Sequence, residues 1–112
     1  MRRETIDRIL KFRDDRDWKQ FHTPKDLAMS VSIEAAELLE NFQWTASNAD
    51  LSSKMDNIAD ELADVLIYCT YMADTLGLDI DQIINDKLLK NNKKYAVEHS
   101  YGSSKKYTEL GE

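Results

Sequence analysis

The chain has 112 residues, of which 42% are hydrophobic and 32% charged, and its formal net charge is −6. This balance indicates a single globular domain over residues 1–112, and the negative charge argues against a general nucleic-acid-binding protein. No apolar run approaches the roughly 20 residues that span a bilayer, and glycine and proline are too scarce for the many turns of an all-β fold, which favours long helices.

Two helices are predicted in the first half of the chain. The first covers residues 4–15 and has a short apolar face at helical spacing. The second begins sharply, because Thr23 can cap it and Pro24 suits the first helical position, and it runs to about residue 42 or 44. The side chains that share its main stripe are Leu27, Val31, Glu34 and Leu38.

Two further helices are predicted in the second half. The third begins near Ser52 or Ser53, with Ser53 as a possible cap, and runs to about Leu76, after which Gly77 can supply a left-handed stop. Its wide apolar stripe predicts a central, heavily buried helix. The fourth covers residues 79–95 with Asp79 as its cap, so that the helical core spans about residues 4–95. The polar tail, residues 96–112, is expected to be irregular.

Four carboxylates form two pairs with the same spacing. Glu34 and Glu37 are three residues apart on the second predicted helix, and Glu61 and Asp64 are three residues apart on the third. Residues with this spacing share a helix face, and each pair lies on or beside an apolar stripe. If the two stripes pack against each other, the four acids come together.

Four negative charges at close quarters are costly, because each desolvated ion costs several kcal/mol. Protonation, Lys or Arg partners, or a metal ion could neutralise them. No Lys or Arg lies in residues 55–72, and Lys25 is the only one in the second predicted helix, so metal is the best candidate. All-oxygen ligands suit hard ions, Mg²⁺ or Mn²⁺. The plainer interpretation is that these acids face solvent on amphipathic helices.

The same residues resemble the MazG-like, all-α nucleoside triphosphate pyrophosphohydrolases, most closely the small dCTP pyrophosphatase type. That family carries a Glu-x-x-Glu pair on one helix and a Glu-x-x-Asp pair on the next, matched here by Glu34 with Glu37 and by Glu61 with Asp64. One departure is Ala35, because many members have a second Glu there. Further matching segments are residues 16–22, 40–44 and 64–68, then Lys87, Asn91, Tyr95, Gly102, Ser103 and Lys106 to Thr108.

The resemblance implies an all-α domain of the four-helix-bundle type that assembles into a homodimer or homotetramer. It also implies Mg²⁺-dependent hydrolysis, with Mn²⁺ possible, of a nucleoside triphosphate such as dCTP to the monophosphate and pyrophosphate, as house-cleaning of the nucleotide pool. Glu34, Glu37, Glu61 and Asp64 would bind the metal and form the catalytic set, in which Glu37 would activate the water. The residues implied for the substrate are Trp18, His22, Trp44, Tyr68, Lys87, Asn91, Lys94 and Tyr95.

Plainer interpretations stand beside these roles. Each Trp could simply pack in the core, His22 could be a solvated loop residue, and Lys94 suits the end of a helix, where cations oppose the dipole. A non-catalytic helical oligomerisation module or a metal-binding module that kept the fold is the alternative function. The intact set of four acids argues against a module that has lost its chemistry.

The remaining sequence features point to the cytoplasm. The first residues mix charges of both signs and lack the apolar stretch of a signal peptide. Cys69 is the only cysteine, so no disulfide can form within the chain, and its apolar neighbours predict a small buried thiol.

Overall fold

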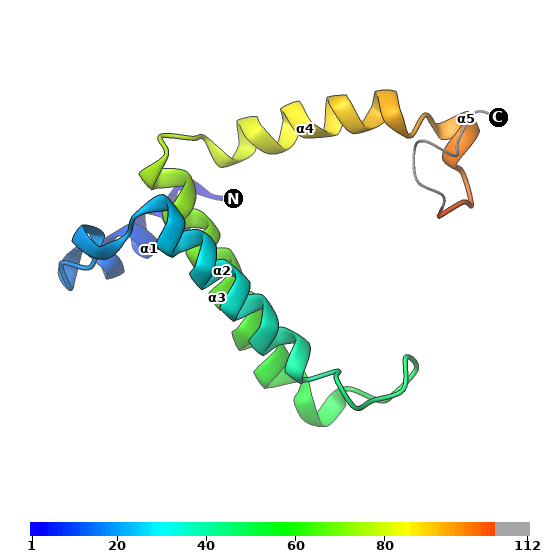
Figure 1. Ribbon diagram of the computed structural model, residues 1–112, viewed down its shortest axis with the longest axis horizontal. Helices are drawn as coiled ribbons and strands as arrows, with labels where there is room; N and C mark the ends of the chain where they lie inside the picture. The colour runs from blue at the N-terminus through cyan, green and yellow to red at the C-terminus, as the bar shows by residue number, and fades with distance from the viewer. Residues whose placement is uncertain (105–112) are drawn as a thin grey trace. The chain divides into compact units, whose positions relative to one another are not determined.

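The computed structural model describes residues 1–104, whose regular structure is helical throughout, without a strand (Figure 1). The prediction of an all-α fold is confirmed. Residues 105–112 lie outside the described part, and with them Lys106, Tyr107 and Thr108 of the family resemblance. The elements are α1 (Arg3–Asp15), the 3-10 helix η1 (Lys19–Phe21), α2 (Pro24–Glu40), the 3-10 helix η2 (Ser52–Lys54), α3 (Met55–Thr75), α4 (Ile80–Lys94) and α5 (Val97–Ser100).

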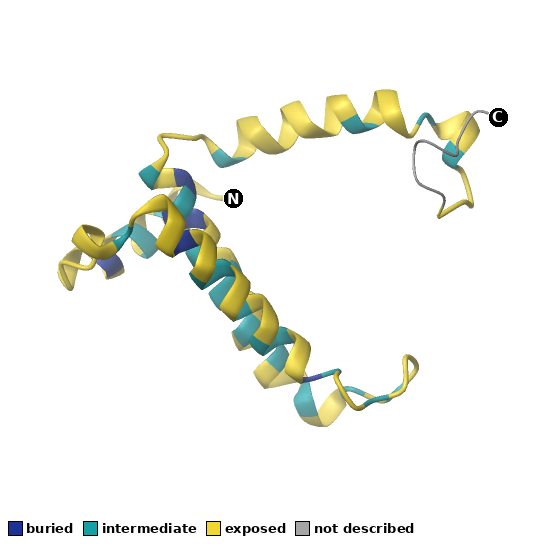
Figure 2. Ribbon diagram, in the orientation of Figure 1, coloured by how far each residue is buried: buried dark blue, intermediate teal, exposed yellow. Residues whose placement is uncertain are grey.

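The chain forms two compact units, Met1–Leu78 and Asp79–Glu112. The first unit is built on a helical hairpin in which α2 and α3 run antiparallel and side by side (Figure 1). Figure 2 shows half-buried residues along the seam between these two helices. The four side chains predicted to share a stripe of α2 are all buried or half-buried: Leu27, Val31, Glu34 and Leu38.

The best-buried side chains gather where α1 joins the hairpin (Figure 2). Leu27 of α2 and Thr70, Tyr71 and Ala73 of α3 are almost completely shielded from solvent. The predicted apolar face of α1 is only half-buried, and the one buried side chain of that helix is Arg13. The core of this unit therefore includes a charged residue.

Two predicted helix caps are present. Thr23 Oγ1 accepts a hydrogen bond from the Asp26 amide at 3.2 Å, and Asp79 Oδ1 accepts one from the Gln82 amide at 2.9 Å. Such bonds satisfy amide groups that have no partner inside the helix. The predicted cap at Ser53 is wrong, because η2 precedes α3 there and no side chain caps α3.

The end of α3 is closed by a Schellman motif. The Leu78 amide donates to the Ala73 carbonyl at 2.8 Å, and the Gly77 amide donates to the Asp74 carbonyl at 3.1 Å. Gly77 has a φ of 68°, the left-handed conformation that the motif requires and that glycine adopts without strain. The sequence prediction of a stop at Gly77 is confirmed.

Replacing Gly77 with Ala should lower the free energy of unfolding by about 1–2 kcal/mol, because a Cβ in the left-handed region costs about that much. No atom lies within 4 Å of the added Cβ, so the cost is conformational and not a clash. Urea unfolding followed by circular dichroism measures it. Gly77→Asn is the matched control and should lose less, since Asn tolerates this conformation; equal stability of the Gly and Ala proteins would contradict the prediction.

Two predictions about α3 are wrong. The helix is not heavily buried, because Leu62 and Leu66 are about half exposed, and Cys69 is exposed as well. The reason is that the apolar stripe of α3 is wider than the part of its surface that α1 and α2 cover.

The second unit contains α4 and the one-turn helix α5, which forms in the segment expected to be irregular. Much of the apolar surface of α4 is exposed, including Ile83, Ile84 and Leu88. Among residues 1–104, no helix combines the length and apolar character needed to cross a membrane.

Candidate functional site

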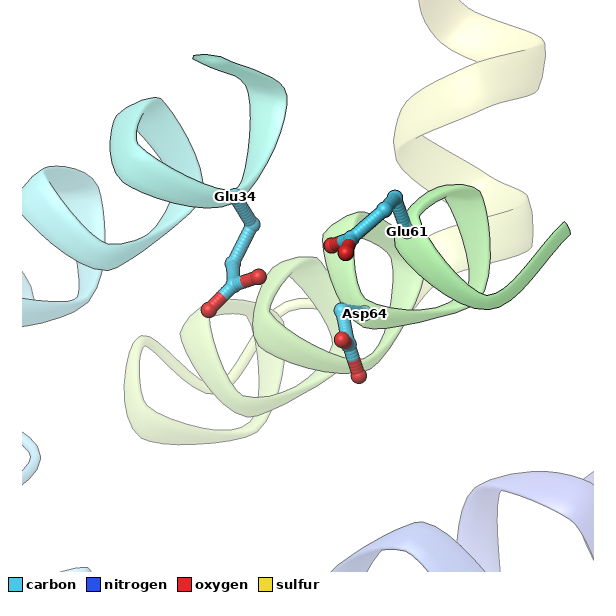
Figure 3. Close-up of side chains that lie close together, drawn as sticks. All are labelled: Glu34, Glu61 and Asp64. Carbon is cyan, nitrogen blue, oxygen red and sulfur yellow. The ribbon is translucent and has the colours of Figure 1, made fainter. Parts of the chain in front are cut away.

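Three carboxylates from the two helices of the hairpin come together. Glu34 extends from α2 toward Glu61 and Asp64, which lie one turn apart on α3 (Figure 3). One carboxylate oxygen from each residue lies within 4.8 Å of the other two, and all three side chains are half-buried. The helical period explains the meeting, because Glu34 belongs to the buried stripe of α2 and the α3 pair faces it.

Glu37 belongs to the same cluster. It lies one turn after Glu34 on α2, and its carboxyl is close enough to raise the pKa of both Glu34 and Glu61. The charge of Glu40 acts on Glu61 as well. Three of the four acids predicted from the sequence therefore meet, and Glu37 and Glu40 lie near enough to act on them.

The cluster holds its protons more tightly than isolated carboxyls would. Burial, followed by hydrogen bonding and repulsion from Glu37, raises the pKa of Glu34 to about 7. Burial and the neighbouring charges also raise the pKa of Glu61. The Oε2 atoms of Glu34 and Glu61 are both buried and have no hydrogen-bond partner among residues 1–104. Within those residues, no Lys or Arg forms an ion pair with the cluster.

A divalent cation fits this donor set. Opposite ligands in an octahedral shell with bonds of about 2.1 Å lie roughly 4.2 Å apart, close to the 4.8 Å span found here. The buried oxygens without partners are the atoms that a cation would satisfy, and all donors are the hard oxygens that Mg²⁺ and Mn²⁺ prefer. The cluster could therefore bind a metal ion.

A cleft of about 430 Å³ lies between α1 and α3 and reaches this cluster. Asp64 belongs to both features, so the cleft adjoins the acids directly. Its walls are mainly apolar and aromatic, with a few polar groups, as in many small-molecule sites. The lining residues are Thr5, Arg8, Ile9, Phe12, Trp18, Asp64, Ile67, Tyr68 and Tyr71.

Comparison with known proteins identifies the family. The MazG-like family matches residues 29–110, which is most of the chain. This protein belongs to the MazG-like family. The resemblance read from the two acidic pairs is thereby confirmed.

Relatives with established names support the same assignment. Mouse dCTP pyrophosphatase 1 is 36% identical over 105 residues and human dCTP pyrophosphatase 1 is 33% identical over 105 residues, in each case over 89% of this chain and 62% of the relative. The chain thus spans about three fifths of the length of these curated relatives. A pyrophosphatase of Archaeoglobus fulgidus, known from its crystal structure, is 42% identical with a TM-score of 0.78, covering 83% of this chain and 90% of that one.

Two of the predicted substrate residues of this MazG-like chain line the cleft, namely Trp18 and Tyr68. His22 is not among the lining residues, but its ring centroid lies 5.0 Å from that of Tyr71, which is, and burial lowers the pKa of its imidazole. Trp44 is 89% exposed and is not among the lining residues. The other four predicted residues lie on or just after α4 in the second unit, and their contact with substrate stays a prediction: Lys87, Asn91, Lys94 and Tyr95.

Sequence reasoning missed most of the cleft. Six lining residues had not been singled out for the site: Thr5, Arg8, Ile9, Phe12, Ile67 and Tyr71. A signal was present, because the lining positions on α1 and on α3 both follow the spacing i, i+3, i+4, i+7. Counting outward from Asp64 along α3 would have found Ile67 and Tyr71.

Proposed function

We propose that this protein is a divalent-metal-dependent nucleoside triphosphate pyrophosphohydrolase. The observation that carries the proposal is the position of Asp64, which belongs both to the acidic cluster and to the aromatic cleft. A nucleotide needs such a pair of neighbouring sites, since its base is flat and largely apolar while its phosphates are anionic. The names of the relatives, dCTP pyrophosphatase and pyrophosphatase, support the same reaction class.

In this proposal the base lies in the cleft, where Trp18 and Tyr68 offer aromatic faces for stacking. Glu34, Glu61 and Asp64 hold Mg²⁺, or alternatively Mn²⁺, next to the phosphates. When bound, the cation neutralises phosphate charge and makes a nearby water more acidic. The substrate we propose is a deoxynucleotide such as dCTP, whose removal cleans the nucleotide pool.

The chain's own residues position the reactants. Glu37, whose carboxyl lies close enough to Glu34 and Glu61 to raise the pKa of both, accepts a proton from the attacking water. The water oxygen bonds to the α-phosphorus while the bond from that phosphorus to the bridging oxygen breaks, so pyrophosphate leaves and the monophosphate stays. Catalysis is then mainly positioning and electrostatic stabilisation.

Incubation with a panel of nucleoside triphosphates and Mg²⁺, with products identified by phosphorus NMR, tests the function. We expect monophosphate and pyrophosphate in equal amounts and no diphosphate. Absence of turnover with every nucleotide, together with undetectable metal binding by calorimetry, would favour the alternative of a non-catalytic helical module.

Assembly into a homodimer or homotetramer is also part of the proposal. Its support is the apolar surface left exposed on the helices, including Ile33, Leu62, Leu66 and Leu88. Light scattering after size-exclusion chromatography should give a mass of two or four chains, and a monomer would contradict the proposal.

The two tryptophans allow a direct test of the cleft. In a Trp44→Phe protein, nucleotide added without turnover should quench the fluorescence of Trp18, because the base stacks on it. Trp18→Ala should raise KM about 5- to 150-fold, since one base–aromatic stack is worth about 1–3 kcal/mol. An unchanged KM would remove Trp18 from the pocket, and the reciprocal Trp18→Phe protein reports whether Trp44 responds as the sequence predicts.

A further inference from the structure

Arg13 is the only buried charged side chain in residues 1–104, with 2% of its surface exposed. Arginine is almost never fully buried unless it is paired, and a buried ion pair stabilises a fold no better than well-packed apolar residues would. Its presence at the junction of α1 with the hairpin therefore calls for a reason beyond stability.

The guanidinium of Arg13 connects α1 with α3. Its Nη1 donates to Asp74 Oδ2 at 2.8 Å, and its Nε donates to the neighbouring Asp14 Oδ1 at 2.8 Å. The guanidinium carbon lies 5.8 Å from the ring centroid of Tyr71, which lines the cleft and precedes Asp74 by one turn on α3. Arg13 itself is not a lining residue, so it can affect the cleft only through lining residues such as Tyr71.

The backbone of Arg13 contacts another lining residue of the cleft, Trp18. Its carbonyl accepts the Trp18 amide at 3.1 Å, and the Asp17 amide donates to the Asp14 carbonyl at 3.1 Å. These bonds form a Schellman motif, with Asp17 in the left-handed conformation at φ 53°. Trp18 in turn packs edge-on against Phe12, with ring centroids 5.8 Å apart.

We infer that Arg13 and Asp74 are positioning residues that fix the separation of the two cleft walls. One wall consists of Phe12 and Trp18, held through the backbone of Arg13. The other is Tyr71, next to which the side chain of Arg13 is anchored. The inference rests on the proposed function, in which these walls hold the base of the nucleotide.

Steady-state kinetics of Asp74→Asn and Arg13→Met test the inference. Loss of the ion pair lets α1 shift relative to α3, so KM for the nucleotide should rise about tenfold, as expected when one stacking wall is misplaced. The kcat value should stay within twofold, because the acidic cluster is untouched. Arg13→Lys keeps the charge and should recover part of the loss. Lys11→Met removes an exposed pair with Asp15 on the same helix and is the control, with unchanged KM.

A readout without substrate separates this inference from the proposed function. In a Trp44→Phe background, Asp74→Asn should shift the emission of Trp18 to the red and increase its quenching by acrylamide, while Lys11→Met should not. Asp74 is partly exposed, so its Asn variant folds even if Arg13→Met does not. If Trp18 emission and KM both stay at the parent's values in Asp74→Asn, the inference is wrong. If the parent turns over no nucleotide, the proposed function fails, and the Trp18 emission still decides the role of Arg13.

Discussion

Replacing Asp64 with Asn should lower kcat/KM for the nucleotide by about 10²- to 10³-fold. Asp64 is the one residue shared by the acidic cluster and the cleft, so its amide would weaken metal binding at the point where the substrate arrives. A loss of this size corresponds to about 3–4 kcal/mol of transition-state stabilisation, within the several kcal/mol that a bound metal supplies. The measurement is steady-state turnover over a series of Mg²⁺ concentrations, which separates weaker metal binding from a lower rate with the metal bound.

The matched control for this experiment is Asp60→Asn. Asp60 lies on the same helix, is exposed and does not belong to the cluster, so its variant should keep full activity. The metal-free Asp64→Asn protein should be at least as stable as its parent, because one negative charge leaves a crowded group. Full activity of Asp64→Asn would remove this residue from the metal site, and a large loss of stability would show that Asp64 supports the fold.

The metal-free protein should lose stability as the pH rises from about 4.5 to about 7, to the extent that Glu34 contributes. The pKa of Glu34 is raised to about 7 in the folded state from a usual value of 4.5, so in this window the folded state binds more protons than the unfolded state. Stability then falls with rising pH. An effect on the order of 1 kcal/mol would move the thermal midpoint by about 4–8 °C in a domain of this size.

Thermal unfolding of the parent and of Glu34→Gln, each with and without Mg²⁺, isolates this contribution. The amide has no charge, so the variant should lack the decline. His22, whose pKa is lowered by burial, adds stability that rises with pH up to about 6.5, and it does so in both proteins. The difference between the two curves is therefore the quantity that reports on Glu34.

Mg²⁺ should stabilise the parent much more at pH 8 than at pH 5, because proton and metal compete for the same oxygens. The affinity for Mg²⁺ should fall by up to about tenfold per pH unit below 7. Equal stabilisation at both pH values would place the ion elsewhere.

The sequence predicted the hairpin and its acids well because both depend on local rules. The Thr23 and Asp79 caps and the Gly77 stop are local signals, and helical period alone placed Glu34 on the buried stripe of α2. Once α2 and α3 pack against each other through their apolar stripes, Glu34 necessarily comes near Glu61 and Asp64. These features needed no knowledge of how distant segments touch.

The cleft depends instead on how α1 lies against α3, which helical period within one segment does not reveal. Arg13 illustrates the difficulty, since composition rules place arginine at the surface while its partner Asp74 is far away in sequence. Cys69, which the sequence predicts to be buried, is exposed for the same reason, because its burial would depend on which segment covers that side of α3. An apolar stripe predicts that a surface is to be covered, but it does not tell which segment covers it or over what width.

Asp64 belongs to both the cleft and the acidic cluster, and this arrangement has a consequence for which phosphate bond would be cut. Under the proposed function, a nucleotide with its base in the cleft would present its phosphates outward from the sugar, so the phosphorus nearest the sugar would be the first to reach the acids. The position of cleavage would then be counted from the nucleoside end of the molecule and not from the free end of its phosphate chain. In this way the length of one aromatic pocket would decide that the chain is cut after its first phosphate.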